Sequence, residues 1–276
     1  MRHITRALLV AGVIGLPAMT TSALAADAAP ASPHTLTSNI GIFSQYVFRG
    51  LTQTNEKPAM QGGFDYAHSS GLYAGVWGSN VSWISDTVGQ QNVSASLELD
   101  TYGGYKGAFS GGDVSYDVGF LRYNYPGDYT QLPTTAAKPD TNEVYGALSY
   151  KWFTAKYSYS LGNTFGVKDA RGSDYIDLSA NFEIADALTL GLHAGKQKFK
   201  GTNAAAWAGT VCTNDCYSYT DYKVSLTKAI KDYSVGIAFT GTNAKGTASD
   251  GTVVWNNRFG KNVGRSEATV FVSRTF

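Results

Sequence analysis

Apolar and polar residues alternate along most of the chain from Leu36 to its end, which is the pattern of β-strands with one apolar and one polar face. The clearest runs cover 93–105, 174–184 and 188–195, where residues of one parity are mostly apolar or small and their neighbours are mostly polar. Residues of the same parity point to the same side of a strand. Each run therefore predicts a strand that separates an apolar from a polar environment.

The pattern predicts about twelve strands in all. The weakest are 72–82, where both faces carry apolar groups, and 113–125, where Arg122 falls on the apolar face after Phe120. A β-bulge after Phe120 would restore the alternation of the second. The predicted strands are 36–50, 58–68, 72–82, 93–106, 113–125, 141–150, 153–160, 174–184, 188–199, 218–228, 233–242 and 267–276.

The links between these strands alternate strictly between short and long. Outer-membrane β-barrels have this arrangement, with short periplasmic turns, long external loops and an even number of strands. Two long links, 126–140 and 243–266, have the length to fold into the barrel mouth, and the sequence leaves open whether they do. The short links lie near 69–71, 107–112, 151–152, 185–187 and 229–232; the other long links lie near 51–57, 83–92, 161–173 and 200–217.

A secreted β-sandwich also alternates, so other features have to decide between the two folds. Ionisable groups recur in the middle of the polar faces, where a dry core would need a partner for each and a wet lumen would not. Aromatic residues gather beside the short links, as in the interfacial girdle of a barrel: Tyr66, Tyr73, Tyr105, Tyr116, Tyr150, Trp152, Phe153, Phe182 and Tyr233. We therefore predict an all-β fold, a transmembrane up-and-down antiparallel β-barrel.

Composition excludes several other classes. The 276 residues have a formal charge of +1, with 43% apolar, 13% aromatic and 16% charged residues and a mean hydropathy of −0.17. A disordered chain has more charge and fewer aromatic residues, and a nucleic-acid binder has a basic surface. A helical membrane protein needs apolar runs of about 20 residues. Two cysteines in so long a chain do not make a disulfide scaffold.

The start of the chain has the three parts of a secretory signal peptide. Arg2 and Arg6 form the basic part, 7–19 is uncharged, and Ala23-Leu24-Ala25 is a small-x-small cleavage site. We expect export to the outer membrane of a Gram-negative cell. The predicted parts are a signal peptide at 1–25, a disordered lead-in at 26–35 and the barrel at 36–276.

Two resemblances support this prediction. The last predicted strand ends at Phe276, with Arg274 interrupting its apolar face, and a terminal phenylalanine resembles the assembly signal of Gram-negative outer-membrane proteins. The second resemblance is to a protein family and rests on these stretches: Ser38-Asn39-Ile40-Gly41, Ser44-Gln45-Tyr46-Val47-Phe48-Arg49-Gly50, Gly71-Leu72-Tyr73-Ala74-Gly75-Val76-Trp77-Gly78-Ser79-Asn80, Glu98-Leu99-Asp100-Thr101-Tyr102-Gly103-Gly104-Tyr105 and Tyr123-Asn124-Tyr125-Pro126-Gly127. With these the mature chain resembles the TorF-like family of outer-membrane porins. The resemblance implies an outer-membrane β-barrel and a pore, and it gives no substrate.

The polar faces carry the candidate functional residues. Acidic groups outnumber basic ones, so a narrow water-filled lumen would favour cations over anions. The alternative is that acids and bases pair across the lumen and fill it, as side chains do in small barrels. The predicted lumen-lining residues are Arg49, Asp65, Glu98, Asp100, Asp117, Glu143, Lys156, Asp177, Glu183, His193, Asp221 and Lys223.

Three groups have a second reading. Glu98 and Asp100 share a face and could serve acid–base or cation chemistry, but we interpret them as part of a wet wall because the sequence places no other ligand there. Cys212 and Cys216 predict a disulfide in a long loop, since export passes through an oxidising compartment. We interpret His193 as lumen-lining, because no nucleophile motif such as G-x-S-x-G accompanies it.

We expect a porin that lets small polar solutes or ions diffuse through a mildly acidic lumen, with no enzymatic activity, no cofactor and no metal. The expected partners are outer-membrane lipid and lipopolysaccharide, the barrel-assembly machinery and the solutes themselves, but not nucleic acid. One alternative is a non-conducting barrel that anchors, adheres or binds a partner through its external loops. A less favoured one is a barrel lipid hydrolase, which would need a serine–histidine pair.

Overall fold

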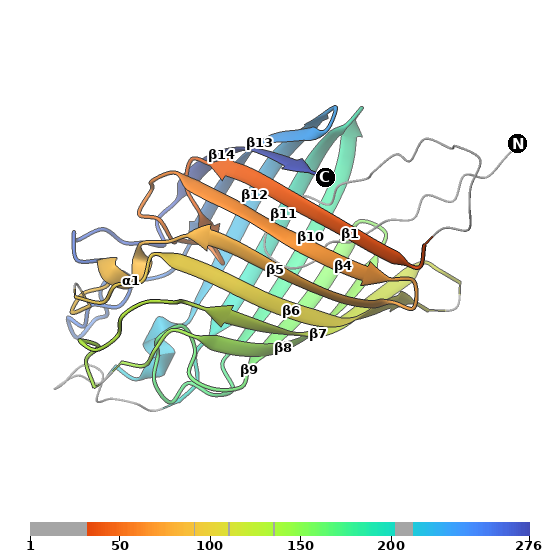
Figure 1. Ribbon diagram of the computed structural model, residues 1–276. Helices are drawn as coiled ribbons and strands as arrows, with labels where there is room; N and C mark the ends of the chain where they lie inside the picture. The colour runs from red at the N-terminus through yellow and green to blue at the C-terminus, as the bar shows by residue number, and fades with distance from the viewer. Residues whose placement is uncertain (1–31, 91, 110, 135, 202–211) are drawn as a thin grey trace, which may run out of the picture.

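The computed structural model describes residues 32–90, 92–109, 111–134, 136–201 and 212–276. The predicted signal peptide and most of the predicted lead-in lie outside these residues. The described chain forms a closed barrel of twelve antiparallel strands in the order β1-β14-β13-β12-β11-β10-β9-β8-β7-β6-β5-β4 (Figure 1). The barrel strands are β1 (His34–Phe43), β4 (Ala59–His68), β5 (Leu72–Asn80), β6 (Leu97–Ala108), β7 (Val114–Asn124), β8 (Thr141–Tyr150), β9 (Phe153–Ser160), β10 (Asp174–Ala185), β11 (Leu188–Lys198), β12 (Tyr219–Ile230), β13 (Tyr233–Thr242) and β14 (Glu267–Thr275). This confirms the predicted fold class.

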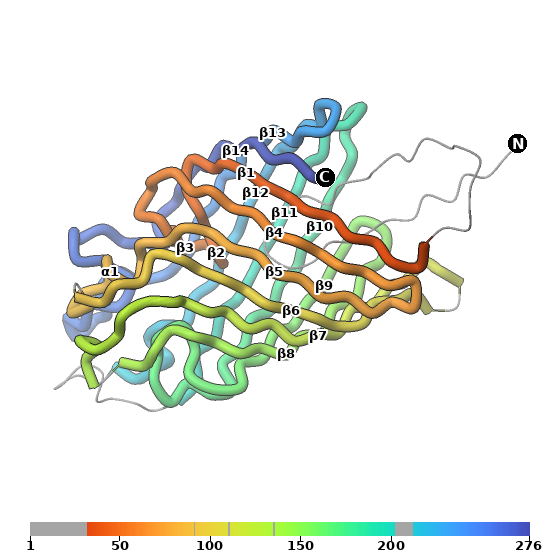
Figure 2. The backbone as a smooth tube through the Cα atoms, in the orientation of Figure 1, coloured from red at the N-terminus to blue at the C-terminus, as the bar shows by residue number. Residues whose placement is uncertain are grey.

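The connections are short at one end of the barrel and long at the other. β1 closes the barrel between β4 and β14, with Asn39 opposite Thr275, and its first residue lies beside the short turn that follows β4. The long connections gather at the end that carries α1 (Trp83–Asp86), as the tube in Figure 2 shows. The long connections also hold η2 (Asn214–Tyr217). The described residues contain no helix with the length and apolar character of a membrane span.

The barrel is apolar outside and polar inside. On β10 the side chain of Leu178 is 53% exposed on the outer wall, whereas on β6 Asp100 faces inward and is 0% exposed. This arrangement agrees with the apolar–polar alternation of the sequence in 174–184 and in β6, whereas Val93 and Ala95, which precede β6, are buried. A closed sheet satisfies all its backbone hydrogen bonds internally, and its apolar exterior suits a lipid surrounding.

Exposed aromatic side chains ring the short-turn end of the outer wall. They include Tyr105, which lies near Tyr116, and Trp152, which packs against Phe182. Tyr73 was predicted for this ring and is not in it, because its hydroxyl points into the lumen and donates to Asp117. The alternation of 72–82 explains the difference, since both parities of that segment carry large apolar groups and the sequence does not say which parity faces lipid.

The β-bulge that would restore the alternation after Phe120 does not form. β7 pairs with β6 and with β8 in unbroken register. Arg122 stays on the outer face near the long-loop end, where its guanidinium lies 3.3 Å from the carboxylate of Asp140. A local ion pair, and not a change of phase, accommodates the charge. The register shifts instead in β10, between Glu183 and Ala185.

Two predicted strands have an end that differs from the structure by four residues or more. β1 ends at Phe43 and not at residue 50, and β6 begins at Leu97 and not at residue 93. After β1, residues 44–58 turn into the barrel and form a two-stranded hairpin of β2 (Val47–Phe48) and β3 (Leu51–Thr52). We call residues 44–58 the inner hairpin.

Candidate functional site: a hairpin across the lumen

The inner hairpin is built on a two-residue turn. Arg49 and Gly50 both adopt left-handed backbone conformations, with φ of 45° and 81°. Two such residues in sequence form the type I′ turn that matches the twist of a tight β-hairpin. A Cβ on Gly50 would lie 2.4 Å from Cγ2 of Thr242 and 2.6 Å from Cβ of Asp221. The turn therefore requires glycine and lies directly against β12 and β13.

Arg49 connects the tip of the hairpin to the far wall. Its guanidinium donates to both carboxylate oxygens of Glu143, at 3.0 and 2.7 Å, and to Oε1 of Gln197 at 2.8 Å. Glu143 is on β8, five strands from β1 around the barrel, and Gln197 is on β11. The ring of Tyr175 lies 4.3 Å from the guanidinium carbon. The inner hairpin therefore crosses the lumen.

This ion pair is buried. The side chains of Arg49 and Glu143 are only 7% and 3% exposed. Burial would lower the pKa of Arg49, but the adjacent Glu143 carboxylate raises it above its ordinary value, so the guanidinium remains charged. A buried pair with good geometry is costly to break, because removing one partner leaves an uncompensated charge.

Tyr46 fixes the root of the inner hairpin. Its hydroxyl donates to Oε1 of Glu98 at 3.0 Å, and its ring packs edge-on against Trp77 at 5.5 Å between centroids. Its backbone N–H donates to the side-chain oxygen of Thr54, which closes the stem. Burial and then the charge of Glu98 raise the pKa of Tyr46, which keeps the hydroxyl protonated as a donor.

Two apolar clusters occupy the long-loop half of the barrel. The first surrounds Tyr46, Trp77 and Tyr125, and the second surrounds Phe199 and Tyr219. Both include residues of the inner hairpin or pack against them. Side chains therefore pack much of the long-loop half, and inward charged groups occur in both halves, with Asp65 and Asp117 nearer the short turns.

One charged cluster spans β10, β11 and β12. Nδ1 of His193 lies 3.2 Å from the carboxylate of Asp177, and its Nε2 lies 2.9 Å from that of Asp221. Ionised carboxylates only accept hydrogen bonds, so both ring nitrogens must carry a proton to satisfy these contacts. Lys223 is opposite His193 in the register. His193 is thus placed as a cation between two acids.

A serine also lies in this cluster. Oγ of Ser179 is 3.2 Å from Nδ1 of His193, and it donates to Asp177 at 2.5 Å. A serine nucleophile needs a neutral base to take its proton. Because His193 faces a carboxylate at each nitrogen, the arrangement suits charge pairing and does not suit nucleophilic catalysis.

Tyrosine hydroxyls hold other inward acids. Tyr102 donates to Asp65 at 2.5 Å. Tyr73 donates to Asp117 at 2.6 Å and is also hydrogen-bonded to Tyr145. These contacts leave part of each carboxylate exposed to the lumen and fix its position. The remaining predicted lumen groups are Lys156, whose Nζ lies 3.9 Å from the ring centroid of Tyr145, and Glu183, which is exposed near the short turns.

Glu98 and Asp100 are enclosed and do not face open water. They are 1% and 0% exposed, and three of their four carboxylate oxygens have no hydrogen-bond partner among the described residues. Within the described part of the chain, no cluster of three or more His, Cys, Asp or Glu side chains could hold a metal ion. The two carboxyl groups are therefore a packed part of the wall beneath the inner hairpin.

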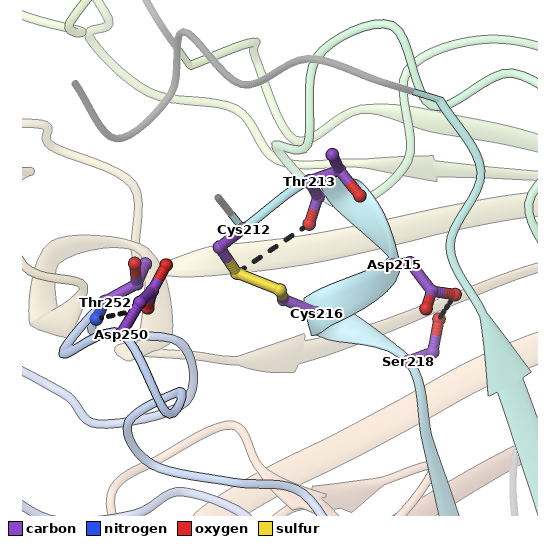
Figure 3. Close-up of a disulfide and its surroundings, with 7 residues drawn as sticks. All are labelled: Cys212, Thr213, Asp215, Cys216, Ser218, Asp250 and Thr252. Atoms are coloured by element: carbon purple, nitrogen blue, oxygen red, sulfur yellow. Dashed lines mark hydrogen bonds between the residues drawn. A yellow bond between two sulfur atoms is a disulfide. The ribbon is translucent and has the colours of Figure 1, made fainter. Parts of the chain in front are cut away.

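Cys212 and Cys216 are joined by a disulfide at η2, in the long connection between β11 and β12. Figure 3 shows the bridge, with Asp250 and Thr252 of the β13–β14 connection in the same region. Between the two cysteines, Nδ2 of Asn214 donates to the backbone carbonyls of Lys168 and Lys200. The bridged turn therefore connects neighbouring loops at the long-loop end.

A family model described as "Bacterial protein of unknown function (Gcw_chp)" matches residues 27–276. The chain belongs to this family. The match covers the whole barrel of this Gcw_chp member, and the family description assigns no activity. No curated protein matches the chain.

Solved porin structures are similar to this Gcw_chp member at low identity. The KdgM porin gives a TM-score of 0.49 at 9% identity, with 87% of this chain and 99% of that chain covered. The NanC porin gives 0.47 at 11% identity, covering 88% and 99%. OprD of Pseudomonas aeruginosa gives 0.38 at 13% identity, covering 87% and 66%. At these values the similarity carries no argument about function, so the function has to be argued from this chain.

The sequence analysis missed the inner hairpin. Arg49 was placed on a wall strand, and the structure places it on a turn inside the lumen. A signal was present, since Arg49-Gly50 stands between Val47-Phe48 and Leu51-Thr52, as a two-residue turn stands between short strands. The apolar–polar alternation continues through residue 48, so the first strand was predicted to continue as well and the turn was not recognised. The long links singled out as able to fold inward were the later ones, 126–140 and 243–266.

Proposed function

We propose that this Gcw_chp protein is an outer-membrane channel for small polar solutes or ions, and that the inner hairpin controls its width. The observation that carries the proposal is a closed barrel with an apolar exterior and a charged lumen that one buried arginine crosses. An apolar band with an aromatic ring at the short-turn end suits a bilayer. A charged interior suits water and hydrated solutes. Passive passage requires no covalent chemistry.

The orientation and the biogenesis follow from the same proposal. The short turns would face the periplasm and the long loops the outside, as in outer-membrane barrels generally. Residues 1–25 would be a signal peptide, and Phe276 would be read by the barrel-assembly machinery. Lipid and lipopolysaccharide would surround the outer wall. The motifs that resemble the TorF-like porins agree with this proposal and add no substrate.

Selectivity would arise in the charged part of the lumen. Inward acids such as Asp65, Asp117 and Asp177 outnumber the inward bases, and their oxygens are positioned by tyrosine or serine hydroxyls. A pore lined by fixed negative charge lowers the entry barrier for cations. We therefore expect a small cation-selective conductance and no passage of large solutes.

The test uses the purified protein in planar bilayers, with a variant in which residues 45–57 are replaced by a short Gly-Ser linker. The full chain should give small discrete conductance steps, and the variant should give larger ones because the crossing segment is gone. Reversal potentials in a salt gradient should show cation preference. A heat-dependent shift on gels would verify that both barrels are folded.

Silence from the folded variant would contradict the channel and favour the non-conducting alternative. One observation already favours that second function, because apolar clusters pack much of the long-loop half of the barrel. In that case the barrel would present its loops to a partner. An esterase is disfavoured by the double carboxylate contact of His193.

A further inference from the structure

A cavity of about 270 Å³ lies on the long-loop side of the inner hairpin. Residues from all six long connections line it, and Arg49 and Phe48 of the hairpin form part of its wall. We call it the vestibule. Small-molecule sites have volumes of about 300–1,000 Å³, so the vestibule is slightly smaller than that range and suits a compact ligand.

Aromatic rings dominate one side of the vestibule. The ring of Trp255 meets Tyr217 and Tyr219 edge-on, at 5.6 and 5.5 Å between centroids, and lies 6.2 Å from Phe199. Edge-to-face packing fixes the orientation of each ring. Because these residues come from two connections and one strand, loop packing builds a rigid aromatic surface here.

Rings from the first apolar cluster line the cavity as well. Phe48 on the inner hairpin packs edge-on against Phe165, at 5.5 Å between centroids, and Trp83 packs edge-on against Tyr125. Phe48, Trp83 and Phe165 all line the vestibule. A ligand in this space would therefore contact aromatic faces and edges from both clusters.

Most polar lining groups are already engaged by the protein; among those described, the indole N–H groups of Trp83 and Trp255 have no hydrogen-bond partner. The Gln197 amide accepts from Arg49 and donates to the backbone, and Nε2 of Gln53 donates to a backbone carbonyl. The side chain of Asn257 donates to Asn55 and accepts from two backbone N–H groups. A sugar would have to leave many hydroxyls without partners on such a wall, at a high desolvation cost.

Two of the three charged lining groups have a charged partner, and Nζ of the third, Lys168, donates to the backbone carbonyl of Thr134 at 3.4 Å. Arg49 is paired with Glu143, and Asp86 lies 3.7 Å from the guanidinium of Arg258. An ion entering the vestibule would gain little from charges that already have a partner. The lining thus offers apolar ring contacts to a ligand and few free polar contacts.

We propose that the vestibule is a binding site for a small solute built on one aromatic ring. Ring faces and edges from Trp255, Phe48 and Phe165 supply the contacts, and the cavity volume limits the solute to about the size of one substituted ring. The site goes beyond the proposed channel, because binding is an equilibrium property that does not require conduction. Its location against the inner hairpin places the bound solute on the segment that crosses the lumen.

The test is calorimetric titration of the full chain in detergent micelles with benzyl alcohol, using glucose as the polar probe. Two variants address the site: Trp255→Leu removes the central ring, and Val167→Trp fills the cavity without removing a ring. Trp152→Leu is the matched control, because Trp152 is exposed at the opposite end. It also corrects for partition of the probe into the micelle.

Saturable binding of benzyl alcohol, weakened at least tenfold by Trp255→Leu and by Val167→Trp but not by Trp152→Leu, would support the site. Unchanged affinity in the folded Val167→Trp variant would overturn it, and so would tighter binding of glucose with the same sensitivity to the variants. Binding without any conductance would overturn the channel alone. Conductance without saturable binding would overturn the site alone.

Discussion

Arg49 at the tip of the inner hairpin forms a two-point ion pair with Glu143 on β8, with N–O distances of 3.0 and 2.7 Å. The two residues are 94 positions apart in the chain. Both side chains are buried, so the pair is a specific lock between the crossing segment and the far wall.

Replacing Arg49 with methionine should release the inner hairpin. Glu143 would be left buried without a cation, and breaking a buried pair in this way costs about 3–5 kcal/mol. The docked hairpin should then leave the wall, and single-channel conductance in planar bilayers should rise. Adding Glu143→Met to Arg49→Met should restore part of the docking, since both charges are then absent. An unchanged conductance in Arg49→Met would contradict the lock.

Gly50→Ala should loosen the hairpin as well. The new Cβ would meet Asp221 and Thr242, and the backbone at φ +81° is strained for alanine. Gly89→Ala is the matched control, because Gly89 has φ +80° and nothing within 4 Å of the added Cβ. We expect a larger loss of heat stability and a larger rise in conductance for Gly50→Ala. Equal effects would show that backbone strain, and not contact with the wall, is responsible.

His193→Phe should leave Asp177 and Asp221 facing each other without the cation between them. The loss of two charged hydrogen bonds, each worth about 1.5–3 kcal/mol, should lower the temperature at which the barrel unfolds. If the lumen conducts, cation selectivity should increase, because one positive group has been removed. Asp177→Asn should shift selectivity the other way. Hydrolysis of a soluble ester should be absent in all three proteins, and activity that depends on His193 would revive the hydrolase alternative.

Leu178→Arg tests which side of the wall faces lipid. Leu178 is 53% exposed on the outer face, and an arginine on the lipid side of a barrel costs about 2–4 kcal/mol at mid-membrane depth. Asn181→Arg is the control on the inward parity of the same strand. Folding into lipid vesicles, followed by urea titration, should show the loss for Leu178→Arg only. The reverse order would contradict the inside-out arrangement.

Cys212→Ser with Cys216→Ser should have a local effect. The bridge closes a ring of only a few residues, so it constrains the unfolded chain little. We expect an unchanged unfolding temperature for the barrel and faster protease cleavage near η2. A large loss of barrel stability would mean that the bridged turn supports the neighbouring loops more than its hydrogen bonds indicate.

The barrel was predictable because its two environments impose a period on the sequence. Leu178 and Asp177 are adjacent in the chain and face opposite sides, which is what a thin wall between lipid and lumen requires. In a segment such as 72–82, residues of both parities are apolar, so the alternation does not show which face meets lipid. Tyr73 was therefore assigned to the wrong face. The charge of Arg122 was read as a change of phase, because its partner Asp140 lies beyond the strand and is brought close only by folding.

The candidate site was less predictable for the same reason. Periodicity identifies which side chains share a face, but it does not say which of them a distant segment will cover. Glu98 and Asp100 have the inward parity, yet Tyr46 of the inner hairpin covers them. The crossing depends on pairings such as Arg49 with Glu143, which join residues far apart in sequence and leave no local pattern.

The inner hairpin docks against strands that follow it in the chain. It belongs to the first connection in the chain, but its docking partners lie on β8, β11, β12 and β13, which are made later. In an incomplete sheet the inner hairpin would therefore remain undocked, because the strands that bind it would not yet be in place. The channel would narrow only after the C-terminal third of the polypeptide had arrived, so closure of the sheet and constriction of the pore would be one late event in biogenesis.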